Sequence, residues 1–250
     1  MKQPRLSIVI PAYNELENFN KGCLQSVADY LKSHQLDWQV IVVDDGSTDG
    51  SPAKIKAWIK NKPNWRFIQN PHQGKAAAVA AGVLAAQNPY TLFTDFDQAT
   101  PISELDKLLP FLKKGYQIVI GSREIKGALR QKEPWYRHFM GKVFNFFVQL
   151  ITIRGIHDTQ CGFKLFKTKT AQKLFKALKV YRPKKEKHAF TGAFDVELLF
   201  IANKQGIRIA EVPVHWYHTP TSRVHLLRDS IRMFFHILKI RLTDIFGGYR

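Results

Sequence analysis

The chain has 250 residues, 45% of them hydrophobic, which is enough for one sizeable core in a single large α/β domain with an appendage. Its 38 lysine and arginine residues against 20 acidic residues give a formal net charge of +18, so the surface should attract polyanions, anionic lipid head groups or phosphorylated substrates. The two cysteines, Cys23 and Cys161, lie far apart and suggest neither a disulfide framework nor a zinc site, which fits a reducing compartment.

The first half of the chain alternates apolar segments rich in Val, Ile and Phe with helical patterns. This rhythm predicts an α/β fold with a mostly parallel, Rossmann-like sheet sandwiched by helices. The run "LSIVIPAY" is too short for a signal peptide and is taken as the first core strand. Ligands of such sheets bind at the carboxyl ends of the strands. The expected strands are 6–13, 38–45, 65–70, 90–97 and 116–123, and the expected helices are 18–34, 52–61, 76–87 and 103–115.

The alternation ends at about Glu124. A basic loop, an apolar helix over 139–154, the segment "DTQCGFKLF" and a second basic stretch at 181–192 follow. A helix over 194–206, a strand within 207–218 and a basic tail complete the chain. We expect one domain over 1–222, with halves at about 1–125 and 126–222, and then a basic amphipathic helix over 223–250.

Two helices are patterned for contact with both protein and lipid. No run of eighteen uncharged apolar residues occurs, so a spanning helix is not expected. The helix over 139–154 carries one narrow polar stripe, so it is either buried in the core or lies in a bilayer interface. The final helix has two apolar sides and a basic strip, which predicts packing on its own protein and contact with an anionic bilayer; an oligomer interface is the alternative. The stripe is Lys142, Asn145, Gln149 and Thr152, and the strip is Arg228, Arg232 and Lys239.

Two expected strands end in aspartates. In "VVDDGSTDGS", Asp44 or Asp45 is placed to accept hydrogen bonds from a nucleotide base or ribose, with helix capping as an equal alternative. In "TDFDQ", Asp95 and Asp97 point to the same side and can converge on one hard cation, whose other ligands are waters and diphosphate oxygens. The sequence lacks the dinucleotide and P-loop motifs, so we expect a metal-bound nucleotide diphosphate held in another way.

Seven segments together resemble the family 2 glycosyltransferases of the GT-A fold, and in particular their polyprenyl-phosphate glycosyl synthases. The likeness runs from Leu6 to about Arg241, and "DTQCGFKLF" followed by "FDVELL" is typical of the lipid-phosphate branch. The resemblance makes 1–125 the nucleotide-sugar half and 126–222 the acceptor half. The other segments that carry it are "LSIVIPAYNE", "VIVVDDGSTDGS", "HQGKAAAVAAG", "TDFDQATP" and "IVIGSR".

The resemblance also implies the residues of the site. Asp97 would hold Mg²⁺ or Mn²⁺ together with Gln98, which replaces a common glycine, and Phe96 stands where a small residue is usual. Arg123, Asp158 and Asp195 would join Asp97 at the reacting centre. Arg123, Arg137 and Gln160 would contact phosphate or acceptor; for Arg137 a solvated charge is an equal alternative. The nucleotide sugar would meet Pro11, Ala12, Tyr13, Glu15, Asp44, Asp45, Lys75, Asp95, Phe96 and Asp97.

The implied activity is inverting transfer of a hexose, most simply glucose from UDP-glucose, to a polyprenyl phosphate such as dolichyl or undecaprenyl phosphate. The enzyme would be attached peripherally to the cytoplasmic face of a membrane. One alternative is a family 2 transferase acting on a polysaccharide or glycolipid hydroxyl, with Asp195 as an obligatory base. Another is a synthase that uses GDP-mannose. Nucleic acid is not an expected partner, because the aromatic residues are not interleaved with Lys and Arg.

Overall fold

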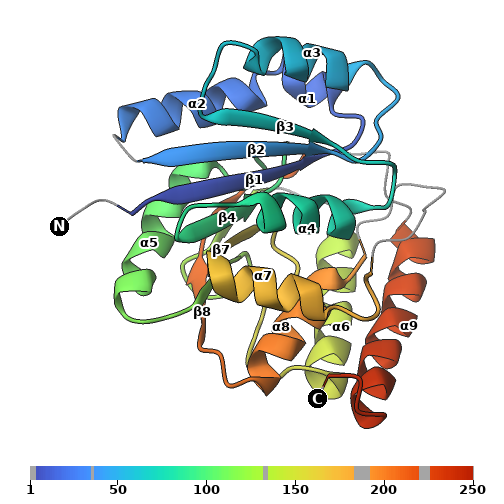
Figure 1. Cartoon of the computed structure of the whole chain (residues 1–250). Coiled ribbons are helices and arrows are strands. Elements are labelled where there is room, and N and C mark those ends of the chain that lie inside the picture. Colours follow the sequence, from blue (N-terminus) through green and yellow to red (C-terminus); the bar gives the residue numbers. More distant parts are fainter. Residues whose placement is uncertain (1–3, 35–36, 132–134, 183–191, 220–225, 250) are drawn as a thin grey trace.

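A computed structural model describes residues 4–34, 37–131, 135–182, 192–219 and 226–249, without the side chains of Arg137 and of residues 226–228. The basic stretch at 181–192 lies largely outside the described residues. The sheet begins close to the first described residue, with β1 (Leu6–Ala12). The apolar segments of the first half are all strands, and the patterns between them are helices, so the predicted α/β class and rhythm are confirmed (Figure 1).

One seven-stranded sheet organises the molecule, in the order β3-β2-β1-β4-β7-β5-β8. Its strands run parallel except β7, which is antiparallel to both β4 and β5. β6 and β9 form a separate parallel pair outside this sheet. The remaining strands are β2 (Trp38–Asp44), β3 (Trp65–Gln69), β4 (Tyr90–Thr94), β5 (Ile118–Ser122), β6 (Leu129–Arg130), β7 (Phe163–Lys167), β8 (Ile209–Pro213) and β9 (His215–Trp216).

Helices cover both faces of the sheet, because the inner strands are apolar on both sides. One core cluster joins the sheet to α2 (Cys23–Ser33), α3 (Ser51–Ile59) and α5 (Leu105–Lys113). A second cluster joins the other face to the remaining long helices. These are α4 (Lys75–Ala85), α6 (Trp135–Ile151), α7 (Thr168–Ala177), α8 (Phe194–Lys204) and α9 (Leu226–Ile245); the short helices are α1 (Leu16–Asn20) and η1 (Ile102–Glu104).

The final helix has the two apolar sides that its pattern predicts. Ile237 and Ile240 are fully buried on the protein, whereas Ile231 and Leu242 are more than half exposed. The helix α9 packs beside α6, with the rings of Phe147 and Phe234 5.1 Å apart (Figure 1). None of the helices in the described part of the chain is both long and apolar enough to cross a bilayer.

Candidate active site

The topology gathers the polar segments at one edge of the sheet. Ala12 is paired with Asp44 at the ends of β1 and β2, and Thr94 at the end of β4 is paired with Phe163 at the start of β7. Because β7 runs antiparallel, the segment before it reaches the same edge. The Asp95 amide donates to the Gly162 carbonyl oxygen, 3.1 Å away. The two sequence motifs "TDFDQ" and "DTQCGFKLF" therefore meet in space.

The loops after β1 and β2 are bonded to each other. The Asn14 amide donates to Ser47 Oγ, and the Thr48 amide donates to Asn14 Oδ1, both over 2.8 Å. The Asp44 carboxylate accepts from the amides of Gly46 and Ser47, so it closes the turn after β2. It does not cap α3, whose N-cap residue is Gly50. The contact of Asp44 with a nucleoside stays a prediction. Pro11, Ala12 and Glu15 are buried beneath these loops, and Tyr13 is half-buried.

Asp45 holds the loop that leads into α4. Its carboxylate accepts from the amides of Gln73 and Gly74, each over 2.9 Å, and from His72 Nδ1 over 2.8 Å. Burial raises the pKa of Asp45, and these hydrogen bonds offset only part of that rise. The His72 ring stacks on Tyr13 with 4.3 Å between centroids. The contacts of Asp45 support a positioning role, and a direct contact with the nucleotide stays a prediction.

The pair Asp95 and Asp97 lies at the end of β4, as predicted for a cation site. Burial, and next the charge of Asp95, raise the pKa of Asp97 to about 6. Gln98 adopts a left-handed backbone with φ of 52°, the conformation that glycine adopts without strain. Its Oε1 atom is buried and has no hydrogen-bond partner among the described residues. Closely spaced carboxylates and an unsatisfied oxygen form a set that a hard cation fits.

The protein supplies few ligands for that cation. Within the ranges that the structure describes, no group of three or more His, Cys, Asp or Glu side chains could hold a metal. A cation bound by one or two carboxylates leaves positions for waters and substrate phosphates, which is how Mg²⁺ is usually held. Asp97 with Gln98 thus fits an ion that arrives with a nucleotide diphosphate.

The expectation for Phe96 is corrected by its placement. Its side chain is only 2% exposed and packs in the core cluster with α2 and α5, although its backbone lies in the turn that follows β4. Phe96 therefore anchors the loop from below instead of lining the pocket. The Asp95 carboxylate lies directly against the backbone of Gly162. A side chain does not fit there, since a Cβ atom at Gly162 would lie 2.0 Å from Asp95 Oδ2.

Two lysines form ion pairs with carboxylates of the site. Lys75 Nζ lies 2.6 Å from Asp95 Oδ1, and Lys164 Nζ lies 2.7 Å from Asp195 Oδ1. Lys164 is almost fully buried and also donates to the Cys161 carbonyl oxygen. Burial raises the pKa of Asp195, and Lys164 offsets part of the rise. The sequence reading missed Lys164, although a lysine at a buried position of "CGFKLF" is a signal for a buried partner.

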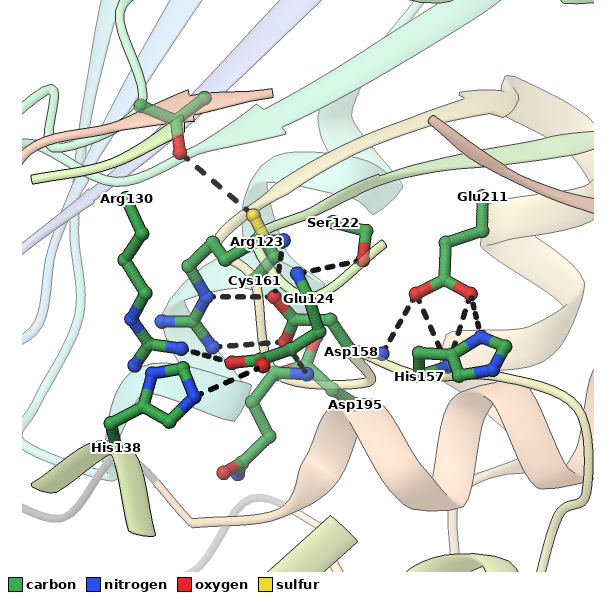
Figure 2. Close-up of polar contacts among 12 residues, drawn as sticks. Ser122, Arg123, Glu124, Arg130, His138, His157, Asp158, Cys161, Asp195 and Glu211 are labelled. Carbon is green, nitrogen blue, oxygen red and sulfur yellow. Dashed lines mark hydrogen bonds and ion pairs between the residues drawn. The ribbon is translucent and has the colours of Figure 1, made fainter. Parts of the chain in front are cut away.

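Arg123 and Asp158 form a two-pronged ion pair at the end of β5. Nε and Nη2 of Arg123 lie 2.7 and 2.9 Å from the two oxygens of Asp158 (Figure 2). Burial would raise the pKa of Asp158, but the charge and hydrogen bonds of Arg123 outweigh it and hold the pKa at about 2. Glu211 of β8, which the sequence reading missed, accepts from the amides of His157 and Asp158 and fixes this loop.

A second arginine lies beside the first. Arg130 pairs with Glu124 (Figure 2). The guanidinium groups of Arg123 and Arg130 lie 5.4 and 5.3 Å from the ring of Trp216. Trp216 and Arg130 are neighbours in the β6-β9 pair. Sequence reasoning missed Arg130 and Trp216, because a two-residue strand leaves no periodic pattern.

A cavity of about 290 Å³ opens between these arginines and α6. The polar stripe predicted for α6 contributes Lys142, Asn145 and Gln149 to its wall, and Gln160 contributes from the segment before β7. The predicted stripe therefore lines a pocket. Asn145 Oδ1 is buried without a hydrogen-bond partner among the described residues. The side chain of Arg137 lies outside the described part of the structure.

Comparisons with known proteins agree with this geometry. The family model described as "Glycosyl transferase family 2" matches residues 7–175. A dolichyl-phosphate beta-glucosyltransferase of Dictyostelium discoideum is 33% identical over 98% of this chain and 76% of its own length. The Homo sapiens protein of the same name is 31% identical, over 98% and 78%.

Solved structures share the fold. Mannosyl-3-phosphoglycerate synthase from Rubrobacter xylanophilus is similar with a TM-score of 0.65, at 18% identity, over 98% of this chain and 75% of that one. The mannosyltransferase PcManGT from Pyrobaculum calidifontis, in complex with GDP-Man and Mn²⁺, is similar with a TM-score of 0.58, also at 18% identity, over 99% and 72%. At such low identity these likenesses concern the fold alone.

Proposed function

The chain belongs to glycosyl transferase family 2, and we propose that it transfers glucose from UDP-glucose to a polyprenyl phosphate with inversion at the anomeric carbon. The names of the similar proteins support the sugar and the acceptor class, since each is a dolichyl-phosphate beta-glucosyltransferase. The observation that carries the proposal is the cavity beside Arg123 and Arg130, which offers cationic and amide groups to a phosphate.

The donor half would hold the nucleotide diphosphate at the carboxyl ends of β1, β2 and β4. Asp97 and Gln98 would hold Mg²⁺ or Mn²⁺ against the two phosphates. The cation, when bound, withdraws charge from the departing diphosphate. Lys75 would hold Asp95 in place under the donor, because its ammonium lies 2.6 Å from that carboxylate.

The acceptor phosphate would lie in the cavity, with its oxygens toward Arg123, Arg130 and Lys142. A phosphate is already an anion near neutral pH, so it can attack the anomeric carbon without a strong base. One phosphate oxygen forms the new bond to the sugar while the bond from the sugar to the nucleoside diphosphate breaks. The fixed guanidinium groups orient the attacking oxygen and exclude water from its place.

Asp195 bears on the alternative in which the acceptor is a hydroxyl. A general base must reach the proton that it removes. Asp195 is 4% exposed and is paired with the buried Lys164, which leaves it poorly placed to accept a proton from an incoming hydroxyl. Its contacts support a role in positioning, and so they favour the phosphate acceptor over a polysaccharide or glycolipid hydroxyl.

The outer faces of α6 and α9 would rest on the anionic, cytoplasmic face of a membrane. Both helices expose large apolar side chains on neighbouring surfaces, and exposed basic residues such as Lys239 and Arg241 accompany them. The pocket opens on an adjoining face of the same α6, since Phe146 belongs both to its lining and to the exposed apolar set. A prenyl chain could therefore lie along the helix while its phosphate enters the cavity. The exposed apolar residues are Trp135, Phe139, Val143, Phe146 and Leu150 of α6, and Ile231, Phe235, Leu242 and Ile245 of α9, with Phe246 just beyond α9.

Transfer of label into an organic-extractable product tests the proposal. The purified protein is given a polyprenyl phosphate and labelled UDP-glucose, GDP-mannose or UDP-N-acetylglucosamine, each with and without EDTA. We expect lipid-linked label from UDP-glucose and its loss with EDTA. Labelling from GDP-mannose alone would establish the mannosyl synthase alternative. Transfer that is unchanged by EDTA would refute the role assigned to Asp97 and Gln98.

A further inference from the structure

Glu197, on the first turn of α8, is a fully buried carboxylate that the transfer chemistry above does not use. Its Oε1 accepts from the amides of Lys179 and Val180 over 2.6 and 2.8 Å, and its Oε2 accepts from the amide of Tyr181 over 3.0 Å. A fourth hydrogen bond comes from Tyr249 Oη, 2.6 Å from Oε1. Such complete satisfaction is what a buried charge requires in order to be tolerated.

The fourth donor belongs to the segment that follows α9. The amides of Gly247 and Gly248 donate to the carbonyl oxygens of Asp244 and Thr243, a turn that ends the helix and reverses the chain. The reversal brings Tyr249 to α8, where its ring meets Phe200 edge-on with 5.9 Å between centroids. Burial and the bond to Glu197 raise the pKa of Tyr249 above its ordinary value.

A second link joins α9 to the residue that precedes α8. Tyr181 Oη accepts from the amide of Ala193 over 2.6 Å and is hydrogen-bonded to His236 Nδ1 of α9, also over 2.6 Å. Ala193 is the N-cap residue of α8. Asp195 follows two positions later and is paired with Lys164. The start of α8 is thus linked on two sides to α9 and the segment after it, through Tyr249 on one side and through Tyr181 and His236 on the other.

We propose that Glu197 is a positioning residue for sugar transfer, which together with Tyr249 and Tyr181 couples α9 to the start of α8 and so fixes Asp195. The proposal rests on the proposed function for the identity of the reaction. It assigns α9 a role beyond membrane contact. The outer side of this helix exposes Ile231 and Phe235, and its inner side helps to fix Asp195 through the start of α8. Loss of either tyrosine bond would leave Asp195 less well fixed without removing any group that touches substrate.

The substitution Tyr249→Phe tests this most cleanly, since it removes one hydroxyl and keeps the ring on Phe200. We expect kcat for polyprenyl phosphate to fall about 10-fold, the effect of one hydrogen bond lost at a buried charge, with the KM for UDP-glucose unchanged. Tyr116→Phe, in the core cluster on the other face of the sheet, is the matched control and should stay within about 2-fold of the original. Both are assayed well below their unfolding temperatures, so that a general loss of folded protein cannot imitate the result.

Amide hydrogen exchange provides a readout that does not depend on turnover. In Tyr249→Phe the amides of Lys179, Val180 and Ala193 should exchange about 10-fold faster than in the original protein, whereas Tyr116→Phe should leave them unchanged. Glu197→Gln should show a larger effect on both readouts, because the amide nitrogen of Gln cannot accept from these donors. If Glu197→Gln does not fold, the kcat and the amide exchange of Tyr249→Phe still test the proposal.

Two results would overturn the proposal. One is Tyr249→Phe with faster exchange at these amides and an unchanged kcat, which would make the link purely structural. The other is unchanged exchange, which would mean that Tyr249 does not hold the start of α8. If the original protein transfers no sugar to polyprenyl phosphate, the proposed function fails separately, and the exchange data still test the coupling.

Discussion

Lys164 Nζ and Asp195 Oδ1 lie 2.7 Å apart, and both side chains are almost completely buried. The lysine comes from β7 and the aspartate from the start of α8, so the pair joins the sheet to this helix. Coulombic interactions extend from Asp195 to Lys75 and Asp95, which places the pair in the same field as the donor site. The site is therefore built on an alternation of buried positive and negative charges.

Breaking this pair should be costly. Lys164→Met leaves Asp195 as a buried charge without its cation, and we expect the free energy of unfolding to fall by about 3–5 kcal/mol. The double variant Lys164→Met/Asp195→Leu should recover much of that loss, because it removes both charges. Urea unfolding of the two single variants and the double variant, compared as a cycle, measures this coupling. Additive losses would show that the two charges do not stabilise each other.

Asp97 should make stability depend on pH in a defined direction. Its pKa of about 6 in the folded protein exceeds the ordinary 3.8, so the folded state is favoured by the proton. That contribution is fully present below about pH 4 and is lost as the pH rises through about 6. At pH 7.5 without divalent cations, Asp97→Asn should therefore melt a few degrees higher than the original protein, and at pH 4 the difference should disappear.

Binding of a metal nucleotide should reverse this order of melting temperatures. Saturating UDP with Mg²⁺ or Mn²⁺ at pH 7.5 should raise the melting temperature of the original protein and leave that of Asp97→Asn nearly unchanged. The same variant should have no turnover, although it folds. Equal stabilisation of both proteins by the metal nucleotide would contradict the assignment of Asp97 as a metal ligand.

The cavity on α6 should determine acceptor affinity. Lys142→Gln removes one cationic group from its wall, and the KM for polyprenyl phosphate should rise about 10-fold while the KM for UDP-glucose is unchanged. Lys173→Gln, an exposed charge on α7, is the matched control and should leave both constants unchanged. Initial rates at varied acceptor and fixed donor measure the split. An increase confined to the KM for UDP-glucose would contradict the placement of the acceptor phosphate in this cavity.

The apolar faces of α6 and α9 should determine membrane binding. Phe146→Asp and Phe235→Asp each place a charge on these faces, where both rings are more than half exposed. We expect at least a 10-fold weaker association with vesicles that contain anionic lipid, because each change removes apolar contact and adds repulsion. Leu84→Asp, an exposed leucine on α4, should bind as the original does. Co-sedimentation with vesicles measures the three variants together.

Long periodic segments made most of the fold predictable from sequence. The β-α rhythm placed every strand of the first half, and the motifs at their ends meet at one edge of the sheet because parallel strands must share that edge. The polar stripe of α6 was predicted from its spacing, but its role as a pocket wall was not. The spacing of residues on a helix does not indicate which part of the protein they contact. The resemblance to family 2 glycosyltransferases, carried by motifs such as "DTQCGFKLF", was confirmed by the family match.

The interior of the site was harder to predict. Phe96 was expected to line the pocket because of its neighbours in the motif, yet from the turn after β4 its side chain packs into the core. Glu211 and Trp216 are parts of the site that no local pattern marks, because their partners lie more than 30 residues away. Long-range pairs of this kind follow from the topology, which the sequence pattern indicates only in outline.

The most direct test of the account is the identity of the acceptor group. The protein is incubated with labelled UDP-glucose, Mg²⁺ or Mn²⁺, and either a polyprenyl phosphate or the polyprenyl alcohol of the same chain length. The account predicts a labelled lipid with the phosphate alone, and release of glucose from it by mild acid, as a sugar phosphodiester requires. Equal or preferred transfer to the alcohol, giving an acid-stable glycoside, would contradict the phosphate site between Arg123, Arg130 and α6.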